Sequence, residues 1–241
     1  MLAVEGLSKR FGGFLAVNQV SFQARQGEIL GLIGPNGSGK STTFNLIAGA
    51  LRASAGSVRF EDENIAGLGA HAVCRRGIAR TFQIPRPFRK LSLLENAELA
   101  AYFGAAGGIS RAEARSRAEQ ALELVGLPTG GDATTAGLGV AALKKLELAR
   151  ALATRPRLLL ADESLGGLDA AEMERAADLI RSIRNRMGIT IIWVEHIMGV
   201  LMRIVDRVIV LDHGEKIFEG APAQAAVDAR VIEVYLGRAR R

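Results

Sequence analysis

A short glycine-rich segment constrains the fold of this chain more than any other feature. It fits the pattern G-x-x-x-x-G-K-[ST], follows the apolar run 28–33 and precedes a helix-like segment at 42–50. Its residues are Gly34, Pro35, Asn36, Gly37, Ser38, Gly39, Lys40, Ser41 and Thr42. A strand, a loop of this kind and a helix in succession are typical of sheets in which parallel strands alternate with helices. We therefore expect an α/β fold.

Each part of this loop suits a bound phosphate. The glycines allow several backbone N–H groups to point at one anion, and the following helix adds the positive end of its dipole. Lys40 would reach the β- and γ-phosphates of a nucleotide, and Ser41 would bind Mg²⁺. The alternative is a chance glycine-rich turn, which the flanking strand and helix argue against. The segment therefore predicts a nucleotide-binding loop.

A second apolar run, 157–161, ends in two adjacent carboxylates, Asp162 and Glu163. Asp162 stands where a strand-end carboxylate can hold the Mg²⁺ shell, and Glu163 stands where it can orient or deprotonate an attacking water. A strand that leads into an acidic turn is common, so the pair alone is a weak signal. Together with the phosphate loop upstream, it predicts nucleotide hydrolysis.

Apolar runs of strand length alternate with helical patterns along the chain, which predicts a mostly parallel sheet. Its central strands should be the short runs 28–33, 157–161 and 189–194, which are bounded by Gly or Pro and rich in Leu or β-branched residues. Alternating segments predict a small antiparallel β section and a C-terminal hairpin, at 2–7, 17–22 and 57–60 and at 207–211 and 216–218.

Helix signals are clear in three places. Ser110 with Glu113 and Asp169 with Glu172 fit the capping-box pattern at a helix N-terminus. A third apolar face, at 143–153, ends before Pro156 because the residue before a proline disfavours the helical region.

The stretch from 85 to 155 carries these helix signals without a convincing strand. We predict a single domain, 1–241, with an inserted α-helical subdomain. The expected parts are a nucleotide-binding core with the antiparallel section at 1–84 and 156–220, the helical subdomain at 85–155 and a C-terminal extension at 221–241.

Composition limits the cellular setting. The single cysteine, Cys74, cannot form an internal disulfide, and the first residues lack the basic and apolar regions of a secretion signal, so we expect a cytoplasmic protein. Uncharged stretches such as 99–110 are too short to cross a bilayer, so a role at a membrane would need a partner. The net charge of +6 is ambiguous, but aromatic residues make up only 5%, which is unlike a base-stacking surface.

With these motifs in this order, the sequence resembles the ATP-binding subunits of ABC transporters along nearly its whole length. Gln83 stands where that family has the Q-loop glutamine that senses the γ-phosphate and Mg²⁺, and residues 166–169 match the D-loop. His196 matches the switch histidine, and Phe11 lies where an aromatic ring stacks on adenine. Each residue alone has an ordinary structural explanation, but their order and spacing favour the resemblance.

The resemblance implies ATP and Mg²⁺ as cofactors and an ABC ATPase fold. It assigns catalytic roles to Glu163, His196 and Gln83, and metal binding to Ser41, Gln83 and Asp162.

The chain departs from the family at its signature loop, Leu-Ser-Gly-Gly-Gln. The corresponding residues are Leu138, Gly139, Val140, Ala141 and Ala142. Hydrogen-bond donors are lost at 139 and 142, and a methyl group at 141 hinders close backbone approach. In the family, two ATP-binding chains form a dimer with ATP between them. Each ATP contacts the Walker motifs of one chain, which correspond here to the glycine-rich loop and the strand-end carboxylates, and the signature loop of the other chain. We therefore predict a heterodimer with unequal sites, with a homodimer as the alternative.

Within the family, the segments 77–83, 93–96 and 234–237 look like importers of branched-chain amino acids and their relatives for urea and short amides. This implies two membrane permease subunits, a second ATP-binding subunit, a periplasmic solute-binding protein and a place at the cytoplasmic face of the inner membrane. Loops on a scaffold are frequent contact sites, and the candidates for permease docking are Pro85, Arg86, Pro87 and Phe88.

Two other classes fit the sequence less well. A soluble ABC ATPase acting on nucleic acid would explain the positive charge, but the chain has no aromatic-basic interleaving and no coiled-coil or zinc-binding insertion. A P-loop kinase would not explain Gln83, residues 166–169 and His196 together. We therefore expect no nucleic-acid partner.

Overall fold

The computed structural model describes residues 1–163, 166–195 and 197–236. These form two compact units, one made of Met1–Ala70 with Thr190–Arg241 and the other of His71–Ile189. We call them unit 1 and unit 2 and describe each separately. The division into core, helical insertion and C-terminal extension remains a prediction.

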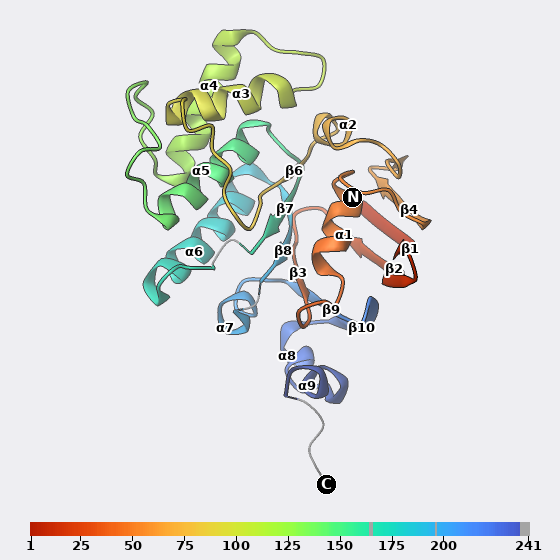
Figure 1. The fold of residues 1–241 in the computed structure, drawn as a ribbon. Helices are drawn as coiled ribbons and strands as arrows, with labels where there is room; N and C mark the ends of the chain where they lie inside the picture. Colours follow the sequence, from red (N-terminus) through yellow and green to blue (C-terminus); the bar gives the residue numbers. More distant parts are fainter. Residues whose placement is uncertain (164–165, 196, 237–241) are drawn as a thin grey trace. The chain divides into compact units, whose positions relative to one another are not determined.

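Unit 1 contains an antiparallel sheet, as the alternating N-terminal segments predict. Its strands are β1 (Leu2–Phe11), β2 (Phe14–Ala24), β4 (Ala55–Phe60) and β5 (Glu63–Asn64). They are arranged in the order β2-β1-β4-β5, and β1 pairs with both β2 and β4 (Figure 1). The observed β1 and β2 extend beyond the predicted ranges because both continue to the tight turn at Gly12 and Gly13.

The second sheet of unit 1 positions the glycine-rich loop, 34–42. At its centre lies β3 (Ile29–Ile33), parallel to β8 (Thr190–Val194) on one side and to β9 (Arg207–Asp212) on the other. β10 (Glu215–Gly220) returns antiparallel to β9, which confirms the predicted C-terminal hairpin. Every residue of β3 and β8 is buried, as expected for parallel strands covered on both faces.

Helices of unit 1 follow these strands. α1 (Lys40–Ile47) begins directly after the glycine-rich loop. Three short helices come later, α7 (Met198–Leu201), α8 (Pro222–Ala225) and α9 (Ala229–Leu236). None of these three helices was predicted, because one or two turns give no measurable period. Figure 1 shows α8 and α9 beyond β10 at the C-terminal end of the chain.

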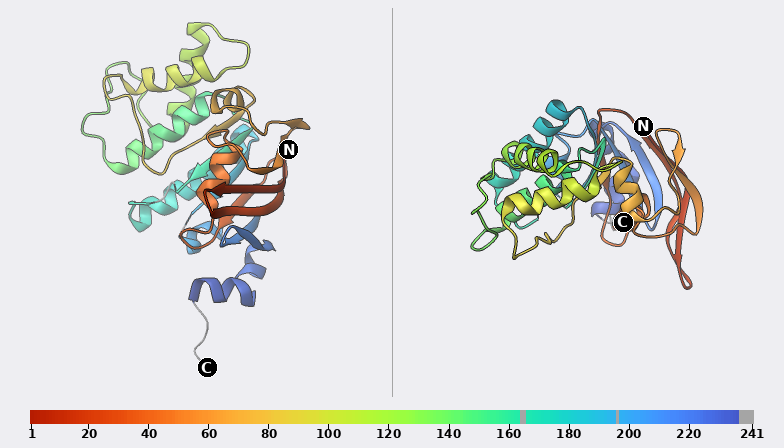
Figure 2. Two further views of the ribbon diagram at one scale, coloured as in Figure 1. Left: turned by 45° about the vertical axis from the view of Figure 1, so that its right-hand side comes forward. Right: turned by 90° about the horizontal axis from the view of Figure 1, so that it is seen from above.

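Unit 2 joins a pair of parallel strands to a group of helices. The strands are β6 (Ile78–Arg80) and β7 (Leu158–Asp162). The helices are α2 (Ala70–Arg75), α3 (Leu93–Gly104), α4 (Arg111–Val125), α5 (Val140–Ala153) and α6 (Ala170–Met187). α3, α4 and α5 pack against one another, as Figures 1 and 2 show. Between residues 85 and 155, all of which the structure describes, the only regular elements are α3, α4 and α5, and none of them is a strand.

The two predicted capping boxes differ in outcome. At α6, Asp169 accepts the N–H of Glu172 at 2.7 Å and the Glu172 carboxylate accepts the N–H of Asp169 at 3.0 Å, so the box is complete. At α4, Ser110 accepts the N–H of Glu113 at 3.1 Å, but the Glu113 carboxylate pairs with Arg117 instead. The box at Ser110 is therefore only half formed, because the ion pair one turn along the helix captures the carboxylate.

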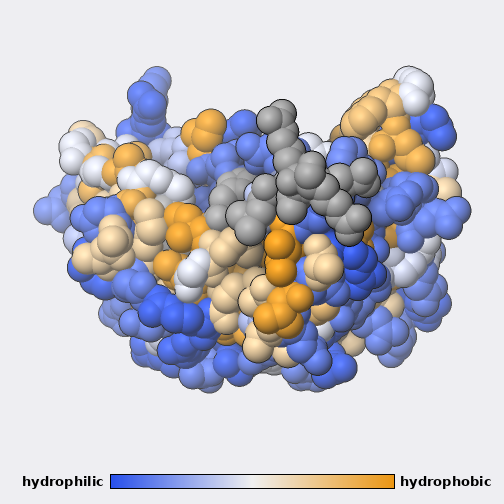
Figure 3. Space-filling view, turned by 90° about the horizontal axis from the view of Figure 1, so that it is seen from below, coloured by the Kyte–Doolittle hydropathy of each residue, from blue (hydrophilic) through white to orange (hydrophobic). Residues whose placement is uncertain are grey.

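Helices of the described residues are all too short or too polar to cross a membrane. Polar and charged side chains make up most of the face shown in Figure 3, with apolar side chains in small groups between them.

Candidate nucleotide-binding site

The glycine-rich loop, 34–42, leaves β3 at a point where a side chain would collide with backbone. Gly34 has a φ of +148°, and a Cβ there would lie 2.1 Å from the carbonyl oxygen of Leu211. Gly39 has a φ of +101°, and its Cβ would lie 2.7 Å from the carbonyl oxygen of Ala16. The close approach of β9 and β2 therefore requires glycine at both positions.

Two buried polar side chains of the loop fit an anion. Lys40 is 5% exposed, and its Nζ donates to the carbonyl oxygens of Gly34 and Pro35, each at 2.8 Å. Ser38 is 1% exposed, and within the described chain its Oγ has no hydrogen-bond partner. A buried hydroxyl of this kind needs a partner, which a phosphate oxygen would supply.

The remaining loop residues are more open. Asn36, Gly37 and Ser41 are exposed, and Thr42 is half-buried in the first turn of α1. No acidic side chain occupies that turn. An anion at the start of α1 therefore meets the positive end of the helix dipole without a competing carboxylate in the turn.

Phe11 ends β1 beside the hairpin turn, with 46% of its surface exposed. The Nζ of Lys9 lies 5.1 Å from the centroid of its ring. The ring is therefore not a core residue, and its open surface can stack on a planar base.

The C-terminal segment supports the loop from outside. The N–H of Gly214, in the β9–β10 turn, donates to the carbonyl oxygen of Ser38 at 3.1 Å. Burial raises the pKa of Tyr235 in α9 to about 12, and a hydrogen bond with the backbone of Gly34 acts in the opposite direction. A cavity of about 640 Å³ lies between the loop and this segment, lined by Pro35, Asn36, Gly37, Ser38, Asp212, His213, Ile217, Arg230, Glu233 and Val234.

In unit 2, Asp162 ends β7 almost fully buried. Its Oδ2 lies 2.7 Å from Nη2 of Arg80, the last residue of the neighbouring β6. Its backbone N–H donates to Oγ1 of Thr81 at 3.1 Å, and the N–H of Thr81 donates to the carbonyl oxygen of Leu160 at 3.0 Å. The parallel pairing of β6 and β7 thus fixes the strand-end carboxylate.

Glu163 follows in a conformation that is uncommon for a residue with a side chain. Its φ is 44°, in the left-handed region. Nε2 of Gln83 donates to its carboxylate, and Nζ of Lys144 in α5 donates to its carbonyl oxygen at 2.9 Å. The structure therefore brings together Gln83 and Glu163, and it connects the turn that carries Glu163 to α5.

The predicted ligands suit the predicted group. The Asp162 carboxylate, the Gln83 side-chain oxygen and the Ser41 hydroxyl are all oxygen donors, which Mg²⁺ prefers. The loop and Ser41 belong to unit 1, whereas Gln83, Asp162 and Glu163 belong to unit 2. His196 lies outside the described residues.

The altered signature residues form the start of α5. Gly139 is the N-cap of this helix, with extended backbone and no side-chain cap, and Val140 is 52% exposed in the first turn. A serine at 139 would present a hydroxyl at this helix start, whereas Gly139 offers only backbone atoms.

The segment after Gln83 is fastened to α5 through its backbone. The N–H of Arg86 donates to Oε2 of Glu147 at 3.4 Å, and Nη1 of Arg150 donates to the carbonyl oxygen of Arg86 at 2.7 Å. Arg150 also pairs with Glu147 at 2.9 Å. Burial raises the pKa of Glu147, and Arg150 and backbone N–H groups oppose that shift.

The same segment is fastened to α3 by Asn96. Its Oδ1 accepts the N–H of Phe88 at 2.8 Å, and its Nδ2 donates to the carbonyl oxygen of Phe88 at 3.1 Å. Three apolar side chains nevertheless remain open to solvent, Phe82 at 45%, Ile84 at 72% and Phe88 at 46%. A held backbone with open apolar side chains is typical of a contact surface.

Three residues that contact the candidate site were not predicted from the sequence. Arg80 pairs with Asp162, Lys144 bonds the backbone of Glu163, and Tyr235 lies at Gly34. Arg80 lies within the segment 77–83 that resembles the importers, but the strand that it ends, β6, was not predicted, so its position beside Asp162 was not foreseen. The contacts of Lys144 and Tyr235 join residues far apart in sequence, which no local pattern reveals.

A phosphate-binding loop after a buried parallel strand, together with a strand-end Asp-Glu pair, defines the class of P-loop nucleotide hydrolases. Comparison with known proteins narrows this class. A sequence model of the ABC transporter family matches residues 17–166, and one described as branched-chain amino acid ATP-binding cassette transporter matches residues 215–240. The chain belongs to the ABC transporter family and is one of its ATP-binding subunits, with the ATPase fold of that family.

The similarity to known proteins extends over nearly the whole chain. The high-affinity branched-chain amino acid transport ATP-binding protein LivG of Salmonella typhimurium is 36% identical, with 99% of this chain and 98% of LivG covered. The corresponding BraF of Pseudomonas aeruginosa is 34% identical over the same shares. Among solved structures, the ADP conformation of an ATP-binding cassette of an ABC transporter superposes with a TM-score of 0.88 at 29% identity, covering 99% of both chains. A nucleotide-free cassette gives 0.87 at 29% identity, also over 99% of both chains.

Proposed function

We propose that this chain powers an ABC importer for branched-chain or other hydrophobic amino acids. The observation that carries the proposal is the similarity to LivG and BraF along 99% of the chain, together with the match of residues 215–240 to the branched-chain group. An importer of urea, short amides or another small organic solute is the alternative within the same class.

In this proposal the loop of unit 1 binds the nucleotide. Backbone N–H groups of the glycine-rich loop and the Ser38 hydroxyl hold phosphate oxygens, and Lys40 exchanges its backbone partners Gly34 and Pro35 for the β- and γ-phosphates. Phe11 stacks on the adenine ring. Ser41, Gln83 and Asp162 would hold Mg²⁺, which neutralises charge on the phosphates when bound.

Glu163 is the proposed general base for the attacking water. Its carboxylate accepts a hydrogen bond from Gln83, which orients it, and its carbonyl oxygen is held by Lys144. The left-handed backbone at Glu163 supports a functional role, since such conformations cluster at active sites. His196 would contact the γ-phosphate, as the family resemblance implies.

The proposed assembly contains two permease subunits, a second ATP-binding subunit and, across the membrane, a periplasmic solute-binding protein. This places the chain at the cytoplasmic face of the inner membrane. Because the start of α5 lacks a hydroxyl at Gly139, we expect a partner with an intact signature and unequal ATP sites. The purified chain alone should turn over ATP more slowly than the mixed pair, and equal rates would contradict the heterodimer.

Residues 85–88 are the proposed contact with a permease. Their backbone is held by Glu147, Arg150 and Asn96, whereas Arg86 and Phe88 remain exposed. A displacement of this segment by the permease would be transmitted to α5 through Glu147 and Arg150. The first residues of α5 face the partner ATPase in the proposed dimer. The double substitution Arg86→Glu and Phe88→Ala should therefore lose uptake and keep ATP binding.

Solute uptake by intact cells tests the proposed function. A strain that lacks this chain should lose uptake of labelled leucine, isoleucine and valine, and the wild-type chain should restore it. Glu163→Gln should fail to restore uptake while the purified variant still binds ATP, because only the proton acceptor is removed. Glu123→Gln is the matched control, since Glu123 is an exposed carboxylate on α4.

The outcomes separate the alternatives. Uptake of urea that depends on the chain, with unchanged leucine uptake, would reassign the solute. Unchanged uptake of all these solutes would contradict an importer, and full activity of Glu163→Gln would remove Glu163 from the role of base.

A further inference from the structure

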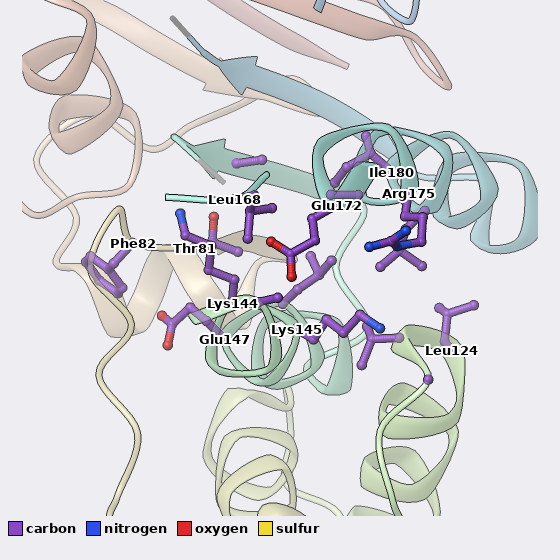
Figure 4. A pocket seen from close by; sticks show the side chains of 17 residues that line it. Thr81, Phe82, Leu124, Lys144, Lys145, Glu147, Leu168, Glu172, Arg175 and Ile180 are labelled. Atoms are coloured by element: carbon purple, nitrogen blue, oxygen red, sulfur yellow. The ribbon is translucent and has the colours of Figure 1, made fainter. Parts of the chain in front are cut away.

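Unit 2 contains a second pocket, whose described lining includes none of the residues proposed to bind ATP or Mg²⁺. Its volume is about 420 Å³, and it lies between α5, α6 and the C-terminal end of α4 (Figure 4). A volume of this order accommodates a small organic ligand.

The walls of this pocket are mainly aliphatic. The larger aliphatic side chains come from all three helices and from the segment before α6: Leu124, Val125, Leu148, Leu168, Leu179 and Ile180. Phe82 and three alanines, Ala141, Ala161 and Ala176, complete the apolar lining. Val125, Leu148, Leu168 and Ile180 are buried, whereas Leu124 and Leu179 are half-buried. An aliphatic group in this space would be removed from water on several sides, which is the main source of affinity in such pockets.

Charged side chains at the pocket leave an excess of unpaired positive charge. Within the described chain, neither Lys145 of α5 nor Arg175 of α6 has a hydrogen-bond or ion-pair partner. In the view of Figure 4, both lie toward the side of the pocket that carries Leu124. Lys145 Nζ would be 3.9 Å from a Cβ placed on Gly126, so its ammonium lies beside the C-terminus of α4.

The other charges of the lining are engaged. The Glu147 carboxylate pairs with Arg150, and Lys144 donates to the carbonyl oxygen of Glu163. Glu172 completes the capping box of α6 with Asp169. The two cations that remain available are therefore not neutralised by the carboxylates of the same pocket.

We propose that this pocket binds an aliphatic carboxylate. Its hydrocarbon body would lie against the leucine and isoleucine side chains, and its carboxylate would pair with Lys145 and Arg175. A cationic ligand would meet like charge, and a nucleotide would place a polar base and ribose against aliphatic walls. A neutral hydrocarbon would leave both cations without a partner.

The position of the pocket gives such a ligand a route to the ATPase cycle. α5 begins at the altered signature residues, and α6 begins directly after residues 166–169. A ligand that touches both helices would therefore connect the altered signature residues with the segment that matches the D-loop. Binding itself does not depend on the proposed transport function.

Isothermal titration of the full-length, nucleotide-free chain tests the assignment. The probes are butanoate, hexanoate and octanoate, with octan-1-ol as the uncharged control. Affinity should rise about fourfold for each buried methylene group. It should fall in high salt, since screening weakens the contact with exposed cations. No binding by octanoate, or equal binding by octan-1-ol, would overturn the proposal.

Variants locate the site. Lys145→Ala and Arg175→Ala should each weaken octanoate about threefold or more, and Arg175→Lys should restore part of the loss. Arg181→Ala is the matched control, because Arg181 is also on α6 but pairs with Asp178 and does not line the pocket. Equal loss in the control, or no loss in either pocket variant, would contradict the site.

Two further ligands, tested in the same titration, distinguish which class of carboxylate the pocket binds. Binding of 4-methyl-2-oxopentanoate as tightly as octanoate would favour branched-chain oxo acids, whereas much tighter octanoate would favour fatty acids. Both results support a carboxylate site. Binding of leucine without octanoate would overturn it, because a zwitterion would then be the ligand.

Discussion

Replacing Arg80 with methionine would test how unit 2 holds the strand-end carboxylate. Arg80 ends β6 and Asp162 ends the parallel β7, with Nη2 and Oδ2 2.7 Å apart and side chains 12% and 6% exposed. Methionine occupies much of the volume of arginine but carries no charge. Asp162 would then be a buried anion without this partner, and we expect the protein to unfold at a lower urea concentration.

The expected loss can be divided into two contributions. Removing one partner of a buried ion pair costs about 3–5 kcal/mol of unfolding free energy. The Arg80 guanidinium also lies 5.1 Å from the centroid of the Phe82 ring. Such a contact at a partly exposed site is worth about 0.5–1 kcal/mol. In an Asp162→Asn background only the second contribution remains, so Arg80→Met should cost about 1 kcal/mol or less.

Urea unfolding followed by circular dichroism measures both costs through a double-mutant cycle. The predicted coupling between Arg80 and Asp162 is the ion-pair contribution alone, about 3–5 kcal/mol. Arg115→Met is the control for loss of an exposed pair, since Arg115 and Glu119 are 57% and 39% exposed, and it should cost under about 1 kcal/mol. Equal losses from Arg80→Met in the two backgrounds would refute the reasoning.

Three further perturbations test other parts of the structure. Gly34→Ala should abolish binding of a fluorescent ATP analogue and lower stability, because its Cβ would lie 2.1 Å from a backbone oxygen; Gly37→Ala, with open space around its Cβ, should be milder. Asp169→Ala should cost about 1 kcal/mol in urea unfolding through loss of the α6 cap, and Asp169→Ser should recover most of it. The raised pKa of Glu147 means that its stabilising contribution is complete below the ordinary carboxyl pKa of about 4.3 and is lost as pH rises through the raised value. The stability of wild type relative to Glu147→Gln should therefore fall as the pH rises above the ordinary carboxyl pKa of about 4.3, and a difference that stays constant with pH would contradict this assignment.

Sequence patterns predicted the parts of the fold that depend on burial along a continuous segment. β3, β7 and β8 were recognised because every position in them is apolar or buried at a strand end. β6 was missed because three residues, Ile78–Arg80, are too few for a pattern. The capping box at Ser110 was only half right, since Glu113 had a competing partner that depends on side-chain geometry.

The candidate site divides in the same way. The loop residues, Asp162 and Glu163 were predicted because their spacing is local. The contacts that hold them are not local, as Arg80 with Asp162 and Lys144 with Glu163 show. These pairings follow from strand order and helix packing, and only a three-dimensional structure reveals them.

The position of β3 has a consequence for the order in which the protein can be made. Its register pairs Ile29 with Ile191 and Leu30 with Arg207, so both neighbouring strands leave the ribosome long after the phosphate-binding loop. Gly214 and Tyr235, which contact the loop, emerge later still. A nascent chain therefore carries its nucleotide motif without the frame that shapes it. ATP binding should report completion of synthesis, and prematurely terminated chains should not compete for the nucleotide.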